Sequence, residues 1–238
     1  MNTNNYKNMH SIMEDNAHLI SMVPVEELIR FGYEIGLKPG MKVLDLCCGY
    51  GTVLKIWHEA FGIQGVGVDR EKSFLDIGAE RLEKQGIDNV LLIYDDVTKY
   101  QDETQYDVVI CSETIDSIEN TFSLGRRFLK PGGILCYQKL YSKVSEPPQE
   151  LLDFDGEVLP LSALNRCFND LGWYMTAMAS DTPGMWEHYV VNWCGKRLWE
   201  EGADPAWIKK WYDMYFDYRR QYEGQAMFAL REIKEIVK

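Results

Sequence analysis

The fold is decided by the stretch VLDLCCGYG, residues 43–51. It begins as a short apolar run that suits a buried strand, and it passes through a glycine-containing turn into a region with helical spacing. Gly49 and Gly51 lack a Cβ, so the backbone at this turn can approach a ligand closely. A strand, a tight turn and a helix in this order are typical of the ligand-binding edge of an open α/β sheet.

Apolar segments alternate with amphipathic ones on both sides of this stretch. Pro24 begins a predicted helix that extends to about Ile35. Short apolar strands separated by amphipathic helices predict a parallel sheet covered on both faces, which is a doubly wound α/β domain. We expect strands at 41–46, 66–69, 90–94, 108–111 and 134–137, and helices at 53–61, 74–82 and 122–129.

The last third of the chain differs in composition and in its pattern of apolar residues. A helix at about 161–171 and strands at 174–178 and 225–230 complete a mostly parallel, seven-stranded sheet. The segment between the last two strands is rich in Trp and Tyr, and we interpret 181–222 as a helical insertion over the active site. Residues 1–23 are predicted to form an N-terminal cap, within a single domain that spans 1–238.

Acidic side chains follow three successive predicted strands. Asp45 stands at the end of the first strand beside the glycine turn, Asp69 ends the second, and Asp95 and Asp96 follow the third. Each acid alone is consistent with a helix cap or a turn. Because the carboxyl ends of parallel strands meet at one edge of a sheet, the three positions together favour a ligand-binding site.

The charge of Asp45 distinguishes between two classes of ligand. A dinucleotide carries an anionic pyrophosphate, which Asp45 would repel, and the pattern G-x-G-x-x-G fails because Leu54 occupies the third glycine position. S-adenosylmethionine (SAM) instead carries an ammonium and a sulfonium group, which a carboxylate attracts. We therefore interpret the turn as binding the methionine part of SAM. Asp69 would accept the ribose hydroxyls, and Asp96 with Val97 would contact the adenine.

With these features, residues 25–140 resemble the class I SAM-dependent methyltransferases. The matching parts are the glycine-rich motif at 45–51, the acid Asp69, the pair Asp96-Val97, the strand at 106–111 and the turn at 129–133. Cys47 stands where that family usually has glycine. The C-terminal third is similar to uncharacterised bacterial small-molecule methyltransferases. The resemblance implies a Rossmann-like fold, SAM as the cofactor, and release of S-adenosylhomocysteine (SAH) after methyl transfer to a small molecule.

The predicted cofactor site gathers the residues at and beside the strand ends. They are Asp45, Leu46, Cys47, Cys48, Gly49, Tyr50, Gly51, Asp69, Arg70, Asp95, Asp96, Val97, Cys111 and Ser112.

Two residues are candidates for a general base. Glu113 follows the fourth strand, so it should lie near the transferable methyl group, and as a base it would need a raised pKa. The alternative for Glu113 is an acid that begins a helix or forms a polar wall. His188 lies among aromatic residues of the insertion, where a histidine is either a base, a substrate contact or a core residue.

Aromatic side chains provide the candidate acceptor contacts. Helix packing explains most of the Trp and Tyr residues, whereas a few could line a pocket for an apolar, aromatic or cationic acceptor. The candidates are Tyr141, Trp186, Tyr189 and Trp193.

Composition narrows the possible partners. The chain has 25 Lys and Arg against 37 Asp and Glu, a net charge of −12, which argues against binding nucleic acid through its phosphates. No apolar run is long enough to span a membrane, and no His or Cys cluster has the spacing of a metal site. The six cysteines lack a C-x-x-C pair and no secretory signal is present, so we expect a cytoplasmic protein, either a monomer or a homodimer.

Three alternatives remain open at this point. A SAM-binding sensor or partner subunit without turnover would have the same cofactor site. A protein or RNA methyltransferase is disfavoured by the charge and by the lack of an Asn- or Asp-Pro-Pro-aromatic motif. An NAD-dependent oxidoreductase is disfavoured by Asp45 and by the missing third glycine.

Overall fold

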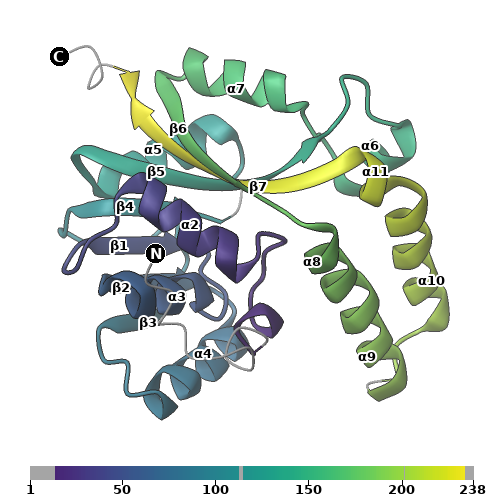
Figure 1. The fold of residues 1–238 in the computed structure, drawn as a ribbon, viewed down its shortest axis with the longest axis horizontal. Helices are drawn as coiled ribbons and strands as arrows, with labels where there is room; N and C mark the ends of the chain where they lie inside the picture. Colours follow the sequence, from purple (N-terminus) through teal and green to yellow (C-terminus); the bar gives the residue numbers. More distant parts are fainter. Residues whose placement is uncertain (1–13, 113–114, 201, 234–238) are drawn as a thin grey trace.

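A computed structural model describes residues 14–112, 115–200 and 202–233 (Figure 1). A helical turn at 14–17 precedes the first labelled helix, α2. The elements of the first half are α2 (Val25–Ile35), β1 (Lys42–Leu46), α3 (Thr52–Phe61), β2 (Gln64–Asp69), α4 (Lys72–Lys84), β3 (Val90–Tyr94), β4 (Tyr106–Cys111) and α5 (Ile118–Phe128).

The second half contains the remaining strands and a group of helices between the last two of them. Its elements are β5 (Leu129–Ser142), α6 (Gln149–Asp155), α7 (Leu161–Asp170), β6 (Trp173–Ser180), α8 (Pro183–Glu187), η2 (His188–Asn192), α9 (Trp193–Glu200), α10 (Pro205–Met214), η3 (Tyr215–Arg219), α11 (Arg220–Tyr222) and β7 (Glu223–Glu232).

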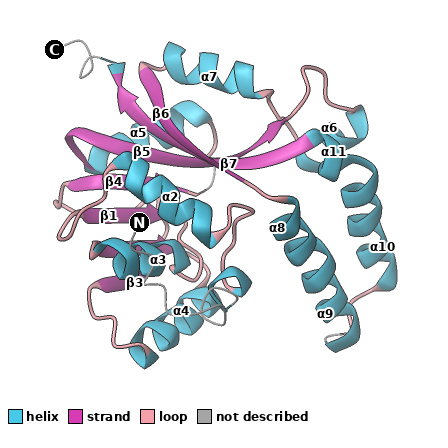
Figure 2. Ribbon diagram, viewed as in Figure 1, coloured by secondary structure: helices cyan, strands magenta, loops and turns pink. Residues whose placement is uncertain are grey.

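The strands form one seven-stranded sheet in the order β3-β2-β1-β4-β5-β7-β6 (Figure 2). Neighbours from β3 to β5 pair in parallel, and β7 pairs antiparallel with both β5 and β6. The sheet is therefore mostly parallel, as the alternation of strands and helices predicts. The direction of winding reverses between β1 and β4, which makes the carboxyl ends of these two strands the switch point of the sheet.

Helices cover both faces of the sheet and divide the core into two layers. Along β4, Val108 and Ile110 pack into the layer formed with α2 and α3, whereas Val109 and Cys111 pack into the layer formed with α5 and α7. This alternation follows from the pleat of a strand, which directs successive side chains to opposite faces. It explains why these strands are apolar throughout their length.

The fifth strand is longer than its apolar run predicts. The sequence indicates 134–137, whereas β5 extends from Leu129 to Ser142 and pairs antiparallel with β7 from Leu135 onward. The apolar run marks only the part that is buried on both faces. Beyond it, the strand is held by its pairing with β7, a contact with residues more than 80 positions later that local sequence does not indicate.

The aromatic-rich segment is helical and lies between β6 and β7, which confirms that part of the prediction (Figure 1). Helices α9 and α10 contact each other. The C-terminal end of the insertion is held against α6 by Arg219. The Arg219 guanidinium donates to the Asp155 carboxylate, with Nε 3.0 Å from Oδ2. None of the described helices is long and apolar enough to cross a membrane.

Candidate functional site

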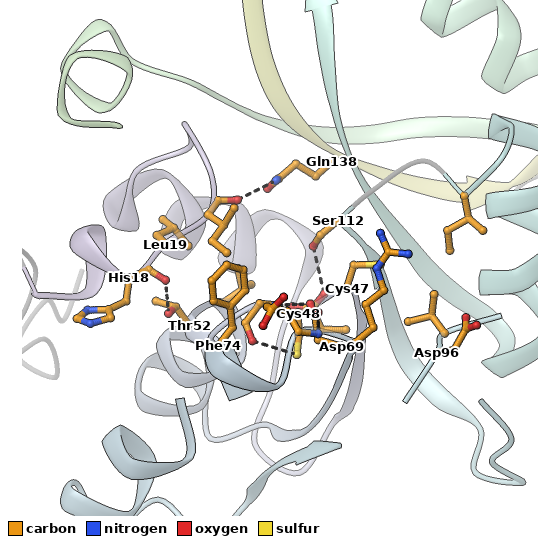
Figure 3. Close-up of a pocket in the computed structure, with 18 of the residues that line it drawn as sticks. His18, Leu19, Cys47, Cys48, Thr52, Asp69, Phe74, Asp96, Ser112 and Gln138 are labelled. Atoms are coloured by element: carbon orange, nitrogen blue, oxygen red, sulfur yellow. Dashed lines mark hydrogen bonds between the residues drawn. The ribbon is translucent and has the colours of Figure 1, made fainter. Parts of the chain in front are cut away.

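A cavity of about 710 Å³ opens at the carboxyl ends of the strands, beside the switch point. Many of the predicted cofactor residues line it (Figure 3). These are Asp45, Cys47, Cys48, Gly49, Asp69, Arg70, Asp96, Val97 and Ser112. The structure therefore brings together the acids at the carboxyl ends of three successive strands.

The turn after β1 forms the floor of the cavity. The backbone is left-handed at Cys47, with φ 67°, and at Gly49, with φ 55°. The amides of Cys47 and Cys48 donate to the Val68 carbonyl at 2.9 and 3.2 Å, which fixes the turn against β2. A Cβ on Gly49 would lie 2.8 Å from Cδ1 of Ile20, so a larger residue there would require the exposed Ile20 side chain to shift, and the positive φ itself favours glycine.

Asp45 lies at the inner wall of the cavity and is almost fully buried, with 1% of its surface exposed. Leu44 and Leu46 pack into the core layer of α5 and α7, so the pleat directs Asp45 to the opposite face. The Ser112 hydroxyl donates to Oδ1 of Asp45 at 3.2 Å, whereas Oδ2 is buried and has no hydrogen-bond partner within the described part of the chain.

Burial determines the ionisation of Asp45. Desolvation raises the pKa of this carboxyl to about 8, although the hydrogen bond from Ser112 acts in the opposite direction. A buried polar atom without a partner is costly, and a cationic group of a ligand would satisfy Oδ2 and favour the charged form. The residues present therefore fit the ammonium or sulfonium side of SAM.

Asp69 ends β2 and links the glycine turn to the next helix. Its Oδ2 accepts from the Gly49 amide at 2.7 Å, and its Oδ1 accepts from the Glu71 amide at 2.8 Å. Each carboxylate oxygen has two lone pairs, so Asp69 retains capacity to accept from a pair of hydroxyls in the cavity. The same side chain thus shapes the turn and offers acceptors to a ribose.

The segment after β3 offers both a backbone donor and a carboxylate. Asp96 accepts from the Thr98 hydroxyl at 2.7 Å and from the Thr98 amide at 3.0 Å, and these bonds lower the pKa of Asp96. The amide of Val97 has no hydrogen-bond partner among the residues that the structure describes. This arrangement suits the adenine contact that the sequence predicts, with an amide for a ring nitrogen.

The rest of the predicted cofactor residues are not among those that line the cavity. Leu46 and Cys111 are buried in the core layer of α5 and α7. The Tyr50 ring packs against Phe74, Gly51 precedes α3, and Asp95 accepts from the Asp96 amide at 2.7 Å. Sequence order alone could not separate these positions from the cavity wall, because they alternate with lining residues along the same strands and turns.

The opposite end of the cavity lies next to β4 and β5. Ser112, Ile115, Asp116 and Gln138 line it there. Gln138 is nearly buried, and its Nε2 donates to the Ile20 carbonyl at 3.3 Å. Glu113, the first candidate base, lies outside the described residues, between two positions that line the cavity, so its role stays a prediction.

Among the described side chains, the candidates on β5 and the insertion do not line this cavity; they are Tyr141, Trp186, His188 and Tyr189. Tyr141 is buried beside Gly224 of β7. Trp186 stacks on Tyr215 with ring centroids 6.3 Å apart, and its Nε1 donates to Asp181. Tyr189 packs against the core.

His188 lies in η2, where its Nδ1 is 3.2 Å from Nδ2 of Asn192. The side chain of Trp193, at the start of α9, lies outside the described part of the structure. The cavity gives no information on whether these residues contact an acceptor. Their roles as acceptor contacts, and that of His188 as a base, stay predictions.

Sequence reasoning missed the contribution of residues 14–23, here called the N-terminal strap. His18, Leu19 and Ile20 of this strap form one wall of the cavity. The sequence predicts only a cap there, because the contacts that place the strap are distant in the chain. Other missed lining residues are Thr52, Val53, Glu71, Phe74, Thr98, Ile115, Asp116 and Gln138. Of these, Gln138 had a detectable signal, since it is a polar residue directly after an apolar strand run.

Comparison with known proteins supplies independent information on the chain. Residues 37–201 match the protein family described as a methyltransferase domain. The chain is 27% identical over 239 residues to the uncharacterised protein YjhP of Escherichia coli K12, a match that covers 92% of this chain and 96% of that protein. The X-ray structure of YjhP superposes with a TM-score of 0.81 at 26% identity, covering 93% of this chain and 98% of that one.

Two further similarities come from characterised or ligand-bound proteins. A SAM-dependent methyltransferase of Geobacter sulfurreducens, solved in complex with SAH, gives a TM-score of 0.79 at 27% identity and covers 94% of this chain and 97% of that one. Phosphoethanolamine N-methyltransferase 1 of Arabidopsis thaliana is 28% identical over 138 residues, a match that covers 57% of this chain and 28% of that protein.

Proposed function

The chain belongs to the class I SAM-dependent methyltransferases, and from this premise we propose that it methylates a small-molecule acceptor and releases SAH. The observation that supports the position of the cofactor most directly is the buried Oδ2 of Asp45, which lacks a partner in the described structure and borders the cavity. A positively charged methionine end satisfies this atom and stabilises its ionised form, whereas an anionic pyrophosphate supplies no positive charge to it.

The remaining contacts follow the order of the strands. Asp69 accepts the ribose hydroxyls, and Val97 with Asp96 meets the adenine ring at the end of β3. Because β3, β2 and β1 are neighbours in the sheet, these contacts lie side by side along one edge. The acceptor then occupies the end of the cavity next to β4 and β5, where Ser112 and Gln138 lie.

SAM supplies a methyl group that is already activated by a positively charged sulfur. The protein therefore contributes alignment of the acceptor and exclusion of water. The strap and the glycine turn enclose the cofactor end, while Ser112 and Gln138 offer hydrogen bonds that orient the acceptor. Where the acceptor must lose a proton, Glu113 is our candidate base, because it follows Ser112 directly in the chain.

The size of the cavity and the net charge of the chain support a small acceptor. Cofactor and acceptor share a space of about 710 Å³, one wall of which is the strap. The net charge of −12 opposes a polyanionic partner such as RNA. One relative, the Arabidopsis phosphoethanolamine N-methyltransferase, is named for a small amine substrate, so small amines are the first acceptors to try.

We also propose a cytoplasmic location. The six cysteines all lie in the described part of the chain and form no disulfide, which is the usual state in a reducing compartment.

An extract of bacterial cells, separated by size, tests the acceptor class. The purified enzyme is incubated with methyl-labelled SAM and with either the low-mass or the macromolecular fraction. We expect label in low-mass products, with a matching amount of SAH released. Label that appears only in protein or RNA would overturn the small-molecule assignment. Absence of label in both fractions, together with normal SAH binding, would contradict turnover under these conditions.

A further inference from the structure

Three charged side chains are buried together where the strap meets α3 and α4. Oδ2 of Asp15 accepts from Lys55 of α3 at 2.9 Å, and its Oδ1 accepts from Arg81 of α4 at 2.7 Å. Asp15, Lys55 and Arg81 are 1%, 3% and 8% exposed. None of the three lines the cavity, so the cofactor contacts do not account for them.

A contribution to folding stability does not by itself explain why Asp15, Lys55 and Arg81 are buried. Removal of charged groups from water is expensive, and replacement by apolar side chains often stabilises a protein as much as the ion pairs do. Buried ion pairs are well suited, however, to fixing one segment in a single position relative to another. Here the segment is the strap, and its partners lie 40 and 66 residues away in the chain.

The other end of the strap is held by a different part of the molecule. The Met22 amide donates to Oε1 of Gln225 on β7 at 2.6 Å, and the Met22 carbonyl accepts from the Thr182 amide at 3.3 Å. Between the two ends, the His18 carbonyl accepts from Thr52 at 2.7 Å and the Ile20 carbonyl accepts from Gln138 (Figure 3). The strap therefore bridges the cofactor half of the sheet and the start of the helical insertion.

The wall that the strap provides lies over the most constrained part of the turn. Ile20 lies so close to Gly49 that a Cβ there would require the Ile20 side chain to shift, and His18 and Leu19 border the same cavity. A molecule bound against the glycine turn is consequently enclosed by the strap for as long as both ends stay attached.

We propose that Asp15 is a positioning residue for the cofactor site, which acts by holding the N-terminal strap closed over bound SAM or SAH. The cofactor enters and the product leaves when the strap detaches from α3 and α4. This role of the strap rests on the SAM site proposed above and does not depend on the identity of the acceptor.

The test compares Asp15→Asn with Glu59→Gln. Both changes remove a carboxylate that pairs with Lys55. Glu59 lies 3.0 Å from Lys55 on α3 itself, and no hydrogen bond or ion pair joins it to the strap in the described structure. Dissociation of labelled SAH, chased with unlabelled SAH, is measured at a temperature at which circular dichroism shows each variant to be folded. We expect SAH to dissociate about tenfold faster or more from Asp15→Asn, and at the wild-type rate from Glu59→Gln.

Hydrogen exchange separates positioning from general stabilisation. In the wild type, bound SAH should slow exchange of the amides at 16–22, and Asp15→Asn should lose this protection while the core strands keep theirs. A purely structural role predicts a lower melting temperature with unchanged SAH dissociation and unchanged strap exchange, and this result would overturn the proposal.

A variant at the opposite end keeps the proposal testable if Asp15→Asn does not fold. Gln225→Ala removes the acceptor for the Met22 amide and should also speed SAH dissociation, because both attachments are needed for closure. Wild-type dissociation from a folded Gln225→Ala protein would contradict a strap that closes as one unit. Failure of the wild type to bind SAH would instead refute the cofactor assignment, so the two failures are distinguishable.

Discussion

At the scale of single residues, the protonation state of Asp45 is the main electrostatic variable of the proposed cofactor site. One of its oxygens accepts from Ser112, and the other is buried without a partner in the described structure. Because burial raises the pKa of Asp45 to about 8, the group holds its proton near neutral pH until a positive charge arrives. Ligand charge and protonation of this residue are therefore linked.

This linkage predicts how SAM binding depends on pH. A cation favours the ionised carboxylate, so SAM should bind more tightly as pH rises from about 6.5 towards 8 and should release a proton from Asp45 on binding. Calorimetry in two buffers with different heats of ionisation measures the released proton. Asp45→Asn should bind SAM about tenfold more weakly or worse, and should retain only the pH dependence of the ligand itself. Equal proton release from both proteins would contradict the role of Asp45.

The glycine turn provides a pair of substitutions with opposite expected signs. Cys47 adopts a left-handed conformation that costs a non-glycine residue about 1 kcal/mol or more, so Cys47→Gly should leave the free energy of unfolding unchanged or raise it slightly. Gly49→Ala places a Cβ near Ile20 on a residue whose backbone is left-handed. It should lower the free energy of unfolding by about 1–3 kcal/mol and weaken SAH binding. Urea denaturation measures both, and a fully stable Gly49→Ala would refute the steric argument.

At the scale of elements, a second buried carboxyl group lies where the helical insertion joins β7. Glu223, the first residue of β7, is fully buried and lies 3.1 Å from Arg219, yet neither of its oxygens makes a hydrogen bond in the described structure. Burial raises its pKa to about 8, and Arg219 opposes this shift only partly. The insertion is thus joined to the sheet beside a carboxyl group, Glu223, whose protonation affects the stability of the fold.

The direction of that pKa shift predicts a loss of stability at higher pH. The folded protein keeps a proton on Glu223 between the ordinary value of 4.5 and about 8, whereas the unfolded chain does not. The stabilisation is therefore complete below about pH 4.5 and is lost as pH rises to about 8. Asp45 acts in the same direction, so the wild-type dependence contains both groups.

Substitution isolates the contribution of Glu223. Relative to wild type, Glu223→Gln should gain roughly 2 kcal/mol in the free energy of unfolding between about pH 5.5 and pH 8.5, because it has no proton to lose. Glu187→Gln on the exposed surface of α8 is the matched control and should show no such gain. Parallel pH profiles for wild type and Glu223→Gln would show that Glu223 titrates normally.

At the scale of the whole molecule, the cofactor half was predictable because its information is local. Asp45, Asp69 and Asp96 each lie at or just beyond the carboxyl end of a strand, and parallel pairing alone brings their positions to one edge. The strap was not predictable, because Asp15 is placed by Lys55 and Arg81, which the sequence does not mark as partners. The insertion was predictable as helical from its composition, whereas its packing depends on β6 and β7, which join it to the sheet.

The account as a whole requires that the cavity at the switch point bind an adenosine thioether and reject a dinucleotide. Titration calorimetry of the wild-type chain with SAH, and separately with NADH, measures this directly. We predict saturable binding of one SAH per chain and no saturable binding of NADH at the same concentrations. Saturable binding of NADH, or no measurable binding of SAH to the folded protein, would contradict the account.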